Sequence, residues 1–382
     1  MIKITDHRKC CGCSACASVC AHGAIAMVAD DLGFLYPKVD ETKCVDCGLC
    51  EKVCNFQEDY NRGNNYPEPL CYAVRSKDDT DLQKSQTGGA FFVLAKSVIE
   101  QGGVVYGAAF DGVRNVKHTR VTDLDGLELL RGSKYIQSNT DNAFRMVKDD
   151  LKAGKTVLYS GTSCQIAGLK NYIGHGPLSE HLFLVDIICH GVGAPAFWKG
   201  NIDYIEAKYN AQVTKANFRD KRFGWNVAKE TYTLSDGREL TRRNFLDLYL
   251  DEYISRDCCA QCPYTNLKRV GDITVGDFWK WTDHHSEFND NKGVSLLLVD
   301  SEKGKTLFEA AKPALAYIES NTPECLQPQL KCPPREHPRK SQLLQEYRTK
   351  GYTYVIRKYT NEGWRLKLKG LAYNILKKIG LK

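Results

Sequence analysis

The spacing of the cysteines near the N-terminus constrains the fold of this chain more than any other feature. Nine of its 17 cysteines lie within the first 54 residues. Eight of these nine form two copies of the pattern C-x2-C-x2-C-x3-C, at Cys10, Cys13, Cys16 and Cys20 and at Cys44, Cys47, Cys50 and Cys54. Such a short segment with little apolar mass needs bound metal or covalent cross-links to fold.

Iron–sulfur clusters explain this pattern better than zinc or disulfides do. Zinc takes four ligands and does not require a third cysteine at a two-residue gap twice over, and disulfides between such close neighbours are strained. In two-cluster ferredoxins the fourth cysteine of each run serves the other cluster. The spacing therefore predicts one 4Fe-4S cluster on Cys10, Cys13, Cys16 and Cys54, and a second on Cys44, Cys47, Cys50 and Cys20.

Two details depart from the usual two-cluster pattern. The proline that commonly follows the fourth cysteine is replaced by Ala21 in one half and by Asn55 in the other. Cys11 is an additional thiol, and we expect it to be a free neighbour rather than a ligand. Neither departure removes a predicted ligand.

The composition excludes several other classes of protein. The 382 residues are 42% hydrophobic and 26% charged, as in ordinary soluble proteins. No apolar run approaches the ~20 residues of a membrane span, and no secretory signal is readable after Met1, so we expect a cytoplasmic protein. The net charge of +7 would fall to roughly +1 with three clusters bound, since each carries about −2 with its thiolates. We therefore expect no nucleic-acid partner.

After residue 70 the chain alternates between predicted strands and helices. Helical spacing covers Ala90–Glu100 and Ala143–Lys152, and hairpins are predicted within Asn217–Leu240 around a turn at Asp236-Gly237. Apolar strands are predicted at Val104–Phe110, Thr156–Tyr159 and His181–Ile188. Strands that are apolar on both faces and alternate with helices indicate an α/β fold.

A second set of cysteines follows these strands. Cys164 and Cys189 each come shortly after a predicted strand, and Cys259 and Cys262 form a C-x2-C pair. Binding sites of α/β sheets lie at the carboxyl ends of the strands, so three loops could bring four thiolates together. From spacing alone, a further cluster and unrelated structural cysteines are equally good explanations. The segment from Gly161 to Gln165 lacks the last glycine of a nucleophile elbow.

Three blocks in this region resemble the coenzyme F420 hydrogenase/dehydrogenase beta-subunit family: SGTSCQIAGL at Ser160–Leu169, VDIICHGV at Val185–Val192 and GDITVGDFW at Gly271–Trp279. Upstream, Thr87–Phe91, Gly103–Phe110 and Arg131–Ser138 resemble the N-terminal domain of that family. The resemblance covers roughly residues 70–300 and preserves the order of the blocks.

The resemblance implies a flavin, usually FAD with FMN as the alternative, beside a 4Fe-4S cluster. It maps the ligands of this third cluster onto Cys164, Cys189, Cys259 and Cys262. The chain would then comprise a small two-cluster ferredoxin domain (1–57), a linker (58–69), an N-terminal flavin domain (70–155), a C-terminal domain with the third cluster (156–345) and a basic tail (346–382).

The same resemblance singles out candidate flavin and catalytic residues. Candidate cofactor contacts are Thr87, Gly88, Gly89, Lys134, Ser160, Gly161, Thr162, Gln165 and Asp277, and the candidate catalytic residues are His190 and Lys134. Four of these sites also have a structural alternative: a turn before a helix for the glycines, a solvated lysine for Lys134, a hydrogen-bonded histidine for His190 and a capping aspartate for Asp277. No G-x-G-x-x-G fingerprint is present, which disfavours direct use of NAD(P)H.

The resulting hypothesis is an iron–sulfur flavoprotein oxidoreductase. A ferredoxin-like carrier or a redox partner subunit would exchange electrons with the clusters, and the flavin would exchange hydride with coenzyme F420 or an organic substrate. One alternative is a non-catalytic electron-transfer subunit of a larger hydrogenase, dehydrogenase or reductase complex. Another is a redox sensor that uses its clusters for stability.

The C-terminal segment is strongly basic. Residues 348–382 carry ten Lys and Arg against one acid, Glu362, so this segment has a charge of +9. Apolar residues from Trp364 to Ile379 recur at helical spacing. The pattern fits three arrangements: peripheral contact with the inner face of a membrane, docking to an acidic partner, or packing on the chain's own core.

Overall fold

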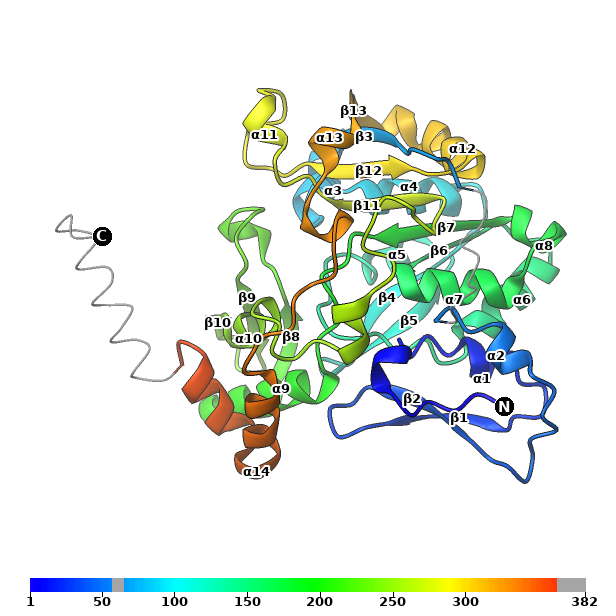
Figure 1. Cartoon of the computed structure of the whole chain (residues 1–382). Coiled ribbons are helices and arrows are strands. Elements are labelled where there is room, and N and C mark those ends of the chain that lie inside the picture. The colour runs from blue at the N-terminus through cyan, green and yellow to red at the C-terminus, as the bar shows by residue number, and fades with distance from the viewer. Residues whose placement is uncertain (57–64, 363–382) are drawn as a thin grey trace.

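The computed structural model describes residues 1–56 and 65–362. Three sheets organise this part of the chain: one of eight strands, one of three, and a two-stranded N-terminal hairpin (Figure 1). Within the described residues no helix has both the length and the apolar character that crossing a membrane requires. The apolar stripe predicted after Trp364 lies outside the described residues.

The eight-stranded sheet has the order β13-β3-β12-β11-β7-β6-β4-β5. The four strands β4, β6, β7 and β11 run parallel, and antiparallel strands flank them on both sides. The strands are β3 (Leu70–Ser76), β4 (Val104–Asp111), β5 (Asn115–Val121), β6 (Val157–Thr162), β7 (Leu182–Ile187), β11 (Ile273–Asp277), β12 (Ser295–Val299) and β13 (Leu315–Ser320). The prediction of an α/β fold is confirmed.

Helices cover both faces of this sheet because its strands are apolar on both sides. Along β6, Leu158 faces a core with α4, α5 and α12, whereas Val157 and Tyr159 face the opposite core with α6 and α7. The helices on these strands and their loops are α3 (Asp79–Lys84), α4 (Ala90–Glu100), α5 (Leu124–Glu128), α6 (Ala143–Lys152), α7 (Ser163–Ile173), α8 (Pro177–Glu180), α11 (Trp281–His284), α12 (Glu302–Ala311) and α13 (Thr322–Cys325).

A second, smaller unit packs beside the large sheet. Its antiparallel sheet consists of β8 (Val213–Asn217), β9 (Glu230–Leu234) and β10 (Glu239–Arg242). It shares an aromatic core with α9 (Pro195–Tyr209), α10 (Asn244–Leu250) and α14 (Lys340–Tyr359), in which Trp198 and Phe218 are fully buried. Short 3-10 helices are η1 (His7–Lys9), η2 (Lys221–Phe223), η3 (Asp257–Gln261), η4 (Lys312–Ala314) and η5 (Pro328–Leu330).

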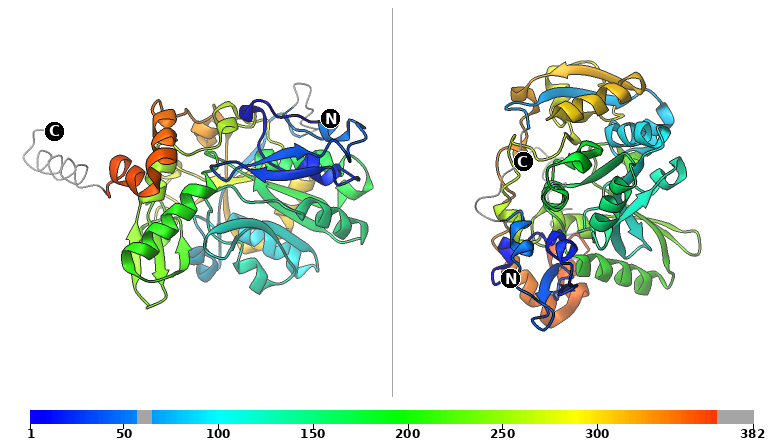
Figure 2. Two further views of the ribbon diagram at one scale, coloured as in Figure 1. Left: turned by 90° about the horizontal axis from the view of Figure 1, so that it is seen from below. Right: turned by 90° about the vertical axis from the view of Figure 1, so that its right-hand side faces the viewer.

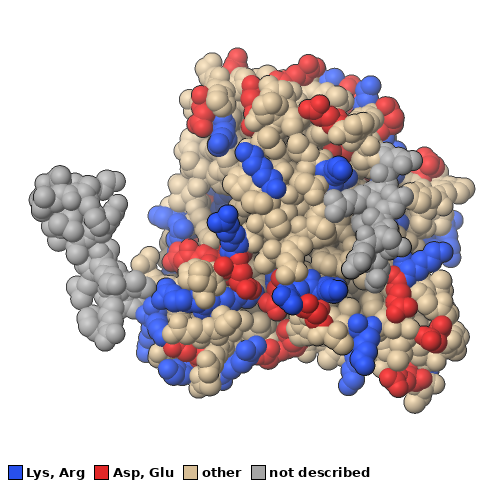
Figure 3. All heavy atoms as spheres, viewed as in Figure 1, with Lys and Arg blue, Asp and Glu red and all other residues tan. Residues whose placement is uncertain are grey.

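The N-terminal segment lies against both units. It contains α1 (Ala15–Val19), β1 (Ile25–Ala29), β2 (Leu35–Val39) and α2 (Leu49–Lys52), with β1 and β2 paired antiparallel. Helix α1 contacts α6 and α7, while Leu32 and Phe34 of the hairpin enter the aromatic core. Both views in Figure 2 show this segment seated on the rest of the chain. On the face drawn in Figure 3, basic and acidic side chains are interspersed.

Most elements predicted from the sequence are present at the predicted places. Helices α4 and α6 have the predicted bounds, and β4, β6, β7 and the β9–β10 hairpin lie where strands were expected. The proposed domain boundary between residues 155 and 156 falls inside the eight-stranded sheet, which takes strands from both sides of it. The boundary at 346 falls inside α14, where Val355 and Ile356 are buried. The predicted linker lies largely outside the described residues.

Candidate functional site

The eight N-terminal cysteines line the turns of the segment that carries α1 and α2. Backbone N–H groups point at several of the sulfurs: Gly12 N lies 3.4 Å from Cys10 Sγ, and Ile2 N lies 3.2 Å from Cys50 Sγ. Cys16 and Cys50 are buried, whereas Cys47 is exposed. Donors aimed at sulfur stabilise thiolates, which is the form that ligates iron.

The surroundings of Cys16 fit the crossed ligation predicted from the spacing. Burial raises the pKa of the Cys16 thiol to about 12, and the nearby Cys10 and Cys54 add to this effect. Cys54 comes from the second cysteine run, so one of its thiols lies close to the first run. Cys16, Cys50 and Cys54 also share one small apolar cluster with Ile2.

The second set of cysteines surrounds a small cavity between the N-terminal segment and the large sheet, here called the thiol cavity. Its thiol-bearing lining residues are Cys11, Cys164, Cys189, Cys258, Cys259 and Cys262. Cys164 lies in the first turn of α7, after β6; Cys189 follows β7, and the other second-set cysteines lie on or next to η3. Because β6 and β7 are parallel, their carboxyl ends deliver Cys164 and Cys189 to one edge of the sheet.

The thiols of this cavity interact closely with one another. Burial, with Cys259 and Cys164 nearby, raises the pKa of the Cys189 thiol. Among residues 1–56 and 65–362, no group of three or more His, Cys, Asp or Glu side chains is arranged to hold a single metal ion. The donor set itself, four predicted ligands around one cavity, fits a thiolate-ligated cluster.

Cys11 and Asn55 join the N-terminal segment to the thiol cavity. The Cys11 thiol contacts both Cys13 and Cys164. Asn55 donates through Nδ2 to the carbonyl of Cys164 at 2.5 Å, and its Oδ1 accepts from Cys11 Sγ at 3.7 Å. Cys11 is therefore a buried junction between the two cysteine sets, a position that its sequence context did not reveal.

A larger pocket of about 490 Å³ opens at the same edge of the sheet. It is lined by His190 and by eight of the nine predicted cofactor residues: Thr87, Gly89, Lys134, Ser160, Gly161, Thr162, Gln165 and Asp277. These residues come from loops separated by as much as 190 positions. The large pocket and the thiol cavity share Thr162, Gln165, Cys189, Gly191 and Val192 as lining residues. The two sites are thus immediate neighbours.

The Gly88-Gly89 turn leads into α4 beside this pocket. Gly89 has a φ of 82° and is the N-cap of α4, so the first N–H groups of the helix face the pocket side. Gly88 does not line the pocket. A Cβ at Gly88 would lie 2.2 Å from the carbonyl oxygen of Val74, so this glycine allows close packing against β3.

Thr162 and Gln165 have structural partners as well as a place in the pocket. The Gln165 Oε1 accepts from the backbone N–H of Thr162, which caps α7, and its Nε2 donates to Ser138. His118 lies behind Ser160, whose carbonyl accepts from Nε2 at 3.0 Å. Burial lowers the pKa of His118 to about 4. These bonds fix the orientation of the pocket wall.

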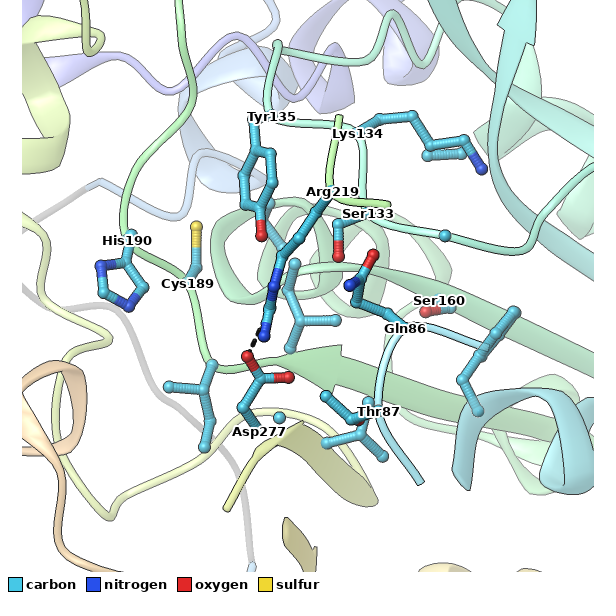
Figure 4. A pocket seen from close by; sticks show the side chains of 18 of the residues that line it. Gln86, Thr87, Ser133, Lys134, Tyr135, Ser160, Cys189, His190, Arg219 and Asp277 are labelled. Atoms are coloured by element: carbon cyan, nitrogen blue, oxygen red, sulfur yellow. Dashed lines mark hydrogen bonds and ion pairs between the residues drawn. The ribbon is translucent and has the colours of Figure 1, made fainter. Parts of the chain in front are cut away.

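The two predicted catalytic residues, Lys134 and His190, both have lowered pKa values. Lys134 donates to the carbonyls of Leu129 and Arg131, and its side chain points away from Asp277 (Figure 4). Burial lowers the pKa of Lys134 to about 7. Burial, with the nearby Arg219 charge, also lowers the pKa of His190. A neutral His190 can donate a hydrogen bond but is a weak source of protons at neutral pH.

An ion pair that the sequence did not reveal stands in the middle of the pocket. Arg219 Nη1 lies 2.6 Å from Asp277 Oδ2, and its Nη2 donates to the carbonyl of Trp225 (Figure 4). Burial raises the pKa of Asp277, while Arg219 opposes that rise. Asp277 is thus a buried, paired carboxylate rather than a helix cap. No local sequence pattern indicates this pair, because Arg219 follows β8 in the smaller unit, 58 positions from Asp277.

Two family profiles match separate parts of this chain. A family profile for the C terminus of the coenzyme F420 hydrogenase/dehydrogenase beta subunit matches residues 154–324. This part of the chain is similar to that beta-subunit family. The profile of the 4Fe-4S dicluster domain matches residues 9–57, which confirms the predicted ferredoxin-type domain.

The similarity of this chain to a solved structure is low. A chain in the structure of the F420-reducing [NiFe] hydrogenase complex from Methanosarcina barkeri is 16% identical, with a TM-score of 0.45; the match covers 78% of this chain and 94% of that chain. No curated protein matches. The two profile matches show a 4Fe-4S dicluster domain followed by a segment similar to the beta subunit of coenzyme F420 hydrogenases and dehydrogenases.

Proposed function

We propose that this chain is an iron–sulfur flavoprotein oxidoreductase with three 4Fe-4S clusters and one flavin, FAD rather than FMN. Two clusters would be held by the eight N-terminal cysteines, and the third by Cys164, Cys189, Cys259 and Cys262. The clusters supply one-electron transfer, and the flavin supplies exchange of hydride with coenzyme F420 or an organic substrate.

One observation carries this proposal: the thiol cavity and the large pocket share a wall that includes Cys189. A cluster ligand at that position would lie next to whatever the pocket binds. The pocket offers the N-terminus of α4 for a phosphate, an apolar lining for a planar ring, and paired polar groups at Arg219 and Asp277.

The roles of the pocket residues follow from their partners. Gly89 and the first turn of α4 would bind phosphate, while Ser160, Gly161 and Thr162 would border the flavin ring. Lys134, whose pKa of about 7 leaves it partly protonated at neutral pH, would hold or release a proton near the flavin. His190 and the Arg219–Asp277 pair would orient the substrate.

The order of the cysteine sets supports an electron path from the surface inward. Cys47 of the second run is exposed, and Cys13 of the first run touches Cys11, which in turn touches Cys164. An external ferredoxin-like carrier or partner subunit would therefore meet the cluster of Cys44, Cys47 and Cys50 first.

Cofactor content of the anaerobically reconstituted chain tests the proposal. We expect about 12 iron and 12 sulfide per chain and about one flavin released on denaturation. Cys262→Ser should remove only the third increment of iron, and Cys71→Ser, outside both sites, should remove none. A plateau near 8 iron would overturn the third cluster. The absence of flavin after reconstitution with FAD and FMN would overturn the flavin.

The second candidate is an electron-transfer subunit with no substrate of its own. The description of the matching family as a beta subunit favours it. Turnover of coenzyme F420 or another acceptor by the isolated, fully loaded chain separates the two. Reversible flavin reduction without any turnover until a partner is added would favour the subunit.

A further inference from the structure

Arg256 stands at the contact between the N-terminal segment and the thiol cavity. It directly precedes η3, and its carbonyl accepts from the N–H of Cys259 at 2.9 Å. Its own N–H donates to Val192 at 3.0 Å. The backbone of Arg256 is thus part of the wall that carries the second cysteine set.

The side chain of Arg256 reaches the opposite way, into the N-terminal segment. Nε donates to the carbonyl of Cys10 at 2.8 Å, and Nη2 donates to the carbonyl of Leu35 at 2.9 Å and approaches Cys10 Sγ at 3.8 Å. Nη1 donates to Gln137 Oε1 at 2.8 Å. The guanidinium carbon lies 4.2 Å from the centre of the Tyr36 ring. One planar group therefore fixes several parts of the interface at once.

The charge of Arg256 lacks the kind of partner that other buried arginines have. The buried arginines of the described chain are Arg219, Arg256 and Arg269. Arg219 pairs with Asp277, and Arg269 pairs with Asp186 at 2.9 Å. In residues 1–56 and 65–362 no carboxylate forms an ion pair with Arg256, which is 1% exposed. An unpaired buried cation is costly unless an anion lies nearby.

The guanidinium of Arg256 approaches the sulfur of Cys10, a predicted cluster ligand, and also lies near Cys258. A cluster with four thiolates carries a net negative charge, so it would offset the buried guanidinium. The loop also closes tightly on the guanidinium: a Cβ at Gly12 would lie 2.9 Å from Arg256 Nη1, and Gly12 has a φ of 68°. The loop between Cys10 and Cys13 is shaped around this side chain.

We propose that Arg256 is a positioning residue that holds the Cys10 loop against the thiol cavity and raises the reduction potential of the 4Fe-4S cluster at Cys10. The inference rests on the proposed function for one point, the ligation of a cluster by Cys10. A nearby positive charge and a hydrogen bond to the sulfur both favour the reduced, more negative cluster. A higher potential at this cluster draws electrons toward the thiol cavity.

Redox titration of the anaerobic holoprotein, followed by EPR, tests the proposal. In Arg256→Gln we expect one N-terminal cluster to become harder to reduce by about tenfold in its equilibrium constant, or about 59 mV for one electron. In Arg256→Lys, which keeps the charge but loses the planar fork, the potential should stay within about threefold while the EPR line shape changes. Arg145→Gln is the matched control, since Arg145 donates to the carbonyls of Ala17, Ser18 and Cys20 but has no hydrogen bond to a sulfur among the described residues.

Several outcomes would overturn the proposal. Unchanged potentials in Arg256→Gln would do so, as would equal shifts of all clusters or an equal shift in Arg145→Gln. If Arg256→Gln loses its iron, the Arg256→Lys variant provides the test. A tenfold drop in its equilibrium constant for reduction would contradict the assigned role. An EPR line shape identical to that of the parent would also contradict it. Cys10→Ser separates this from the proposed function, because unchanged iron and spectra in that variant would refute the ligation itself.

Discussion

The structure gives a reason for Asn55, which departs from the usual two-cluster ferredoxin pattern. Proline commonly stands after the fourth cysteine, but proline has no side-chain amide. The Asn55 amide bonds the Cys164 carbonyl at 2.5 Å and accepts from Cys11 Sγ at 3.7 Å. Here the ferredoxin-type segment must dock on a second set of cysteines, and an amide serves that contact. At the equivalent position of the other half, Ala21 is exposed.

Replacing Asn55 with alanine should loosen this contact. Leaving the Cys164 carbonyl without its side-chain donor should lower the free energy of unfolding by about 1–3 kcal/mol. Anaerobic urea unfolding of the loaded protein measures the change. Ala21→Asn, at the equivalent position of the other half, should leave the midpoint unchanged. An Asn55→Ala protein as stable as the parent would mean that the amide contributes nothing.

His118 should make stability depend on pH. Ser160 accepts from Nε2 through its carbonyl, and Ser138 Oγ lies 3.0 Å from Nδ1, so the neutral ring is fully hydrogen-bonded. The pKa of His118 is lowered to about 4 in the fold from 6.5. Between these values the unfolded chain binds more protons, so stability is present above pH 6.5 and is lost as the pH falls.

The variant His118→Gln isolates this contribution. On going from pH 7.5 to pH 5, the parent should lose roughly 2 kcal/mol more unfolding free energy than the variant. Glu230 and Glu252 act with the opposite sign, because burial raises the pKa of each to about 7. Both glutamates remain in the variant, so their contributions to the pH dependence cancel when the two proteins are compared. Parallel pH profiles for the two proteins would show that His118 does not titrate as stated.

At the scale of elements, α7 brings the two cysteine sets together. The helix starts at Ser163, carries Cys164 in its first turn, and packs its middle against the N-terminal segment. A Cβ at Gly168 would lie 2.6 Å from Cys13 Sγ. The missing side chain at Gly168 is therefore the reason that the first cysteine run can approach this helix.

Gly168→Ala should disturb the first cluster although alanine favours helix formation by about 1 kcal/mol. We expect altered EPR signals or lost iron at the cluster of Cys13, since the methyl group displaces the sulfur. Gly200→Ala is the control: Gly200 lies on α9, and its Cβ would lie 2.9 Å from the ring of Tyr352 on α14, with no cysteine among its nearest atoms. It should lower stability without changing the cluster signals. Unaltered signals in Gly168→Ala would disprove the close approach.

Local patterns predicted many elements because their information lies within a few residues. Strand β7 is an apolar run, and α6 ends shortly before Gly154, which has a positive φ. The partners of the site could not be predicted in this way. Arg256 meets Cys10 across 246 positions, and Arg219 meets Asp277 across 58. Neither arginine belongs to a motif, and only the packing of whole units brings such pairs together.

At the scale of the whole molecule, the exposed end of the cysteine path predicts where a carrier docks. Cys47 is exposed, and its neighbours Val45 and Leu49 are 60% and 44% exposed, an apolar surface beside a predicted cluster ligand. A carrier must approach a cluster closely for electrons to pass, and apolar side chains at such a contact add affinity. The proposed path therefore begins at this surface.

The double variant Val45→Ser/Leu49→Ser should slow reduction of the holoprotein by a low-potential ferredoxin about threefold or more, as expected for lost apolar contact area. Stopped-flow mixing under anaerobic conditions gives the second-order rate constant. Iron content and cluster potentials should stay as in the parent, since neither side chain is a ligand. Leu129→Ser is the matched control, because Leu129 is 59% exposed but lies beside α5, apart from the cysteines. Equal rates for the double variant and the parent would place carrier docking elsewhere, and equal slowing in Leu129→Ser would attribute the effect to general surface apolarity rather than to the surface around Cys47.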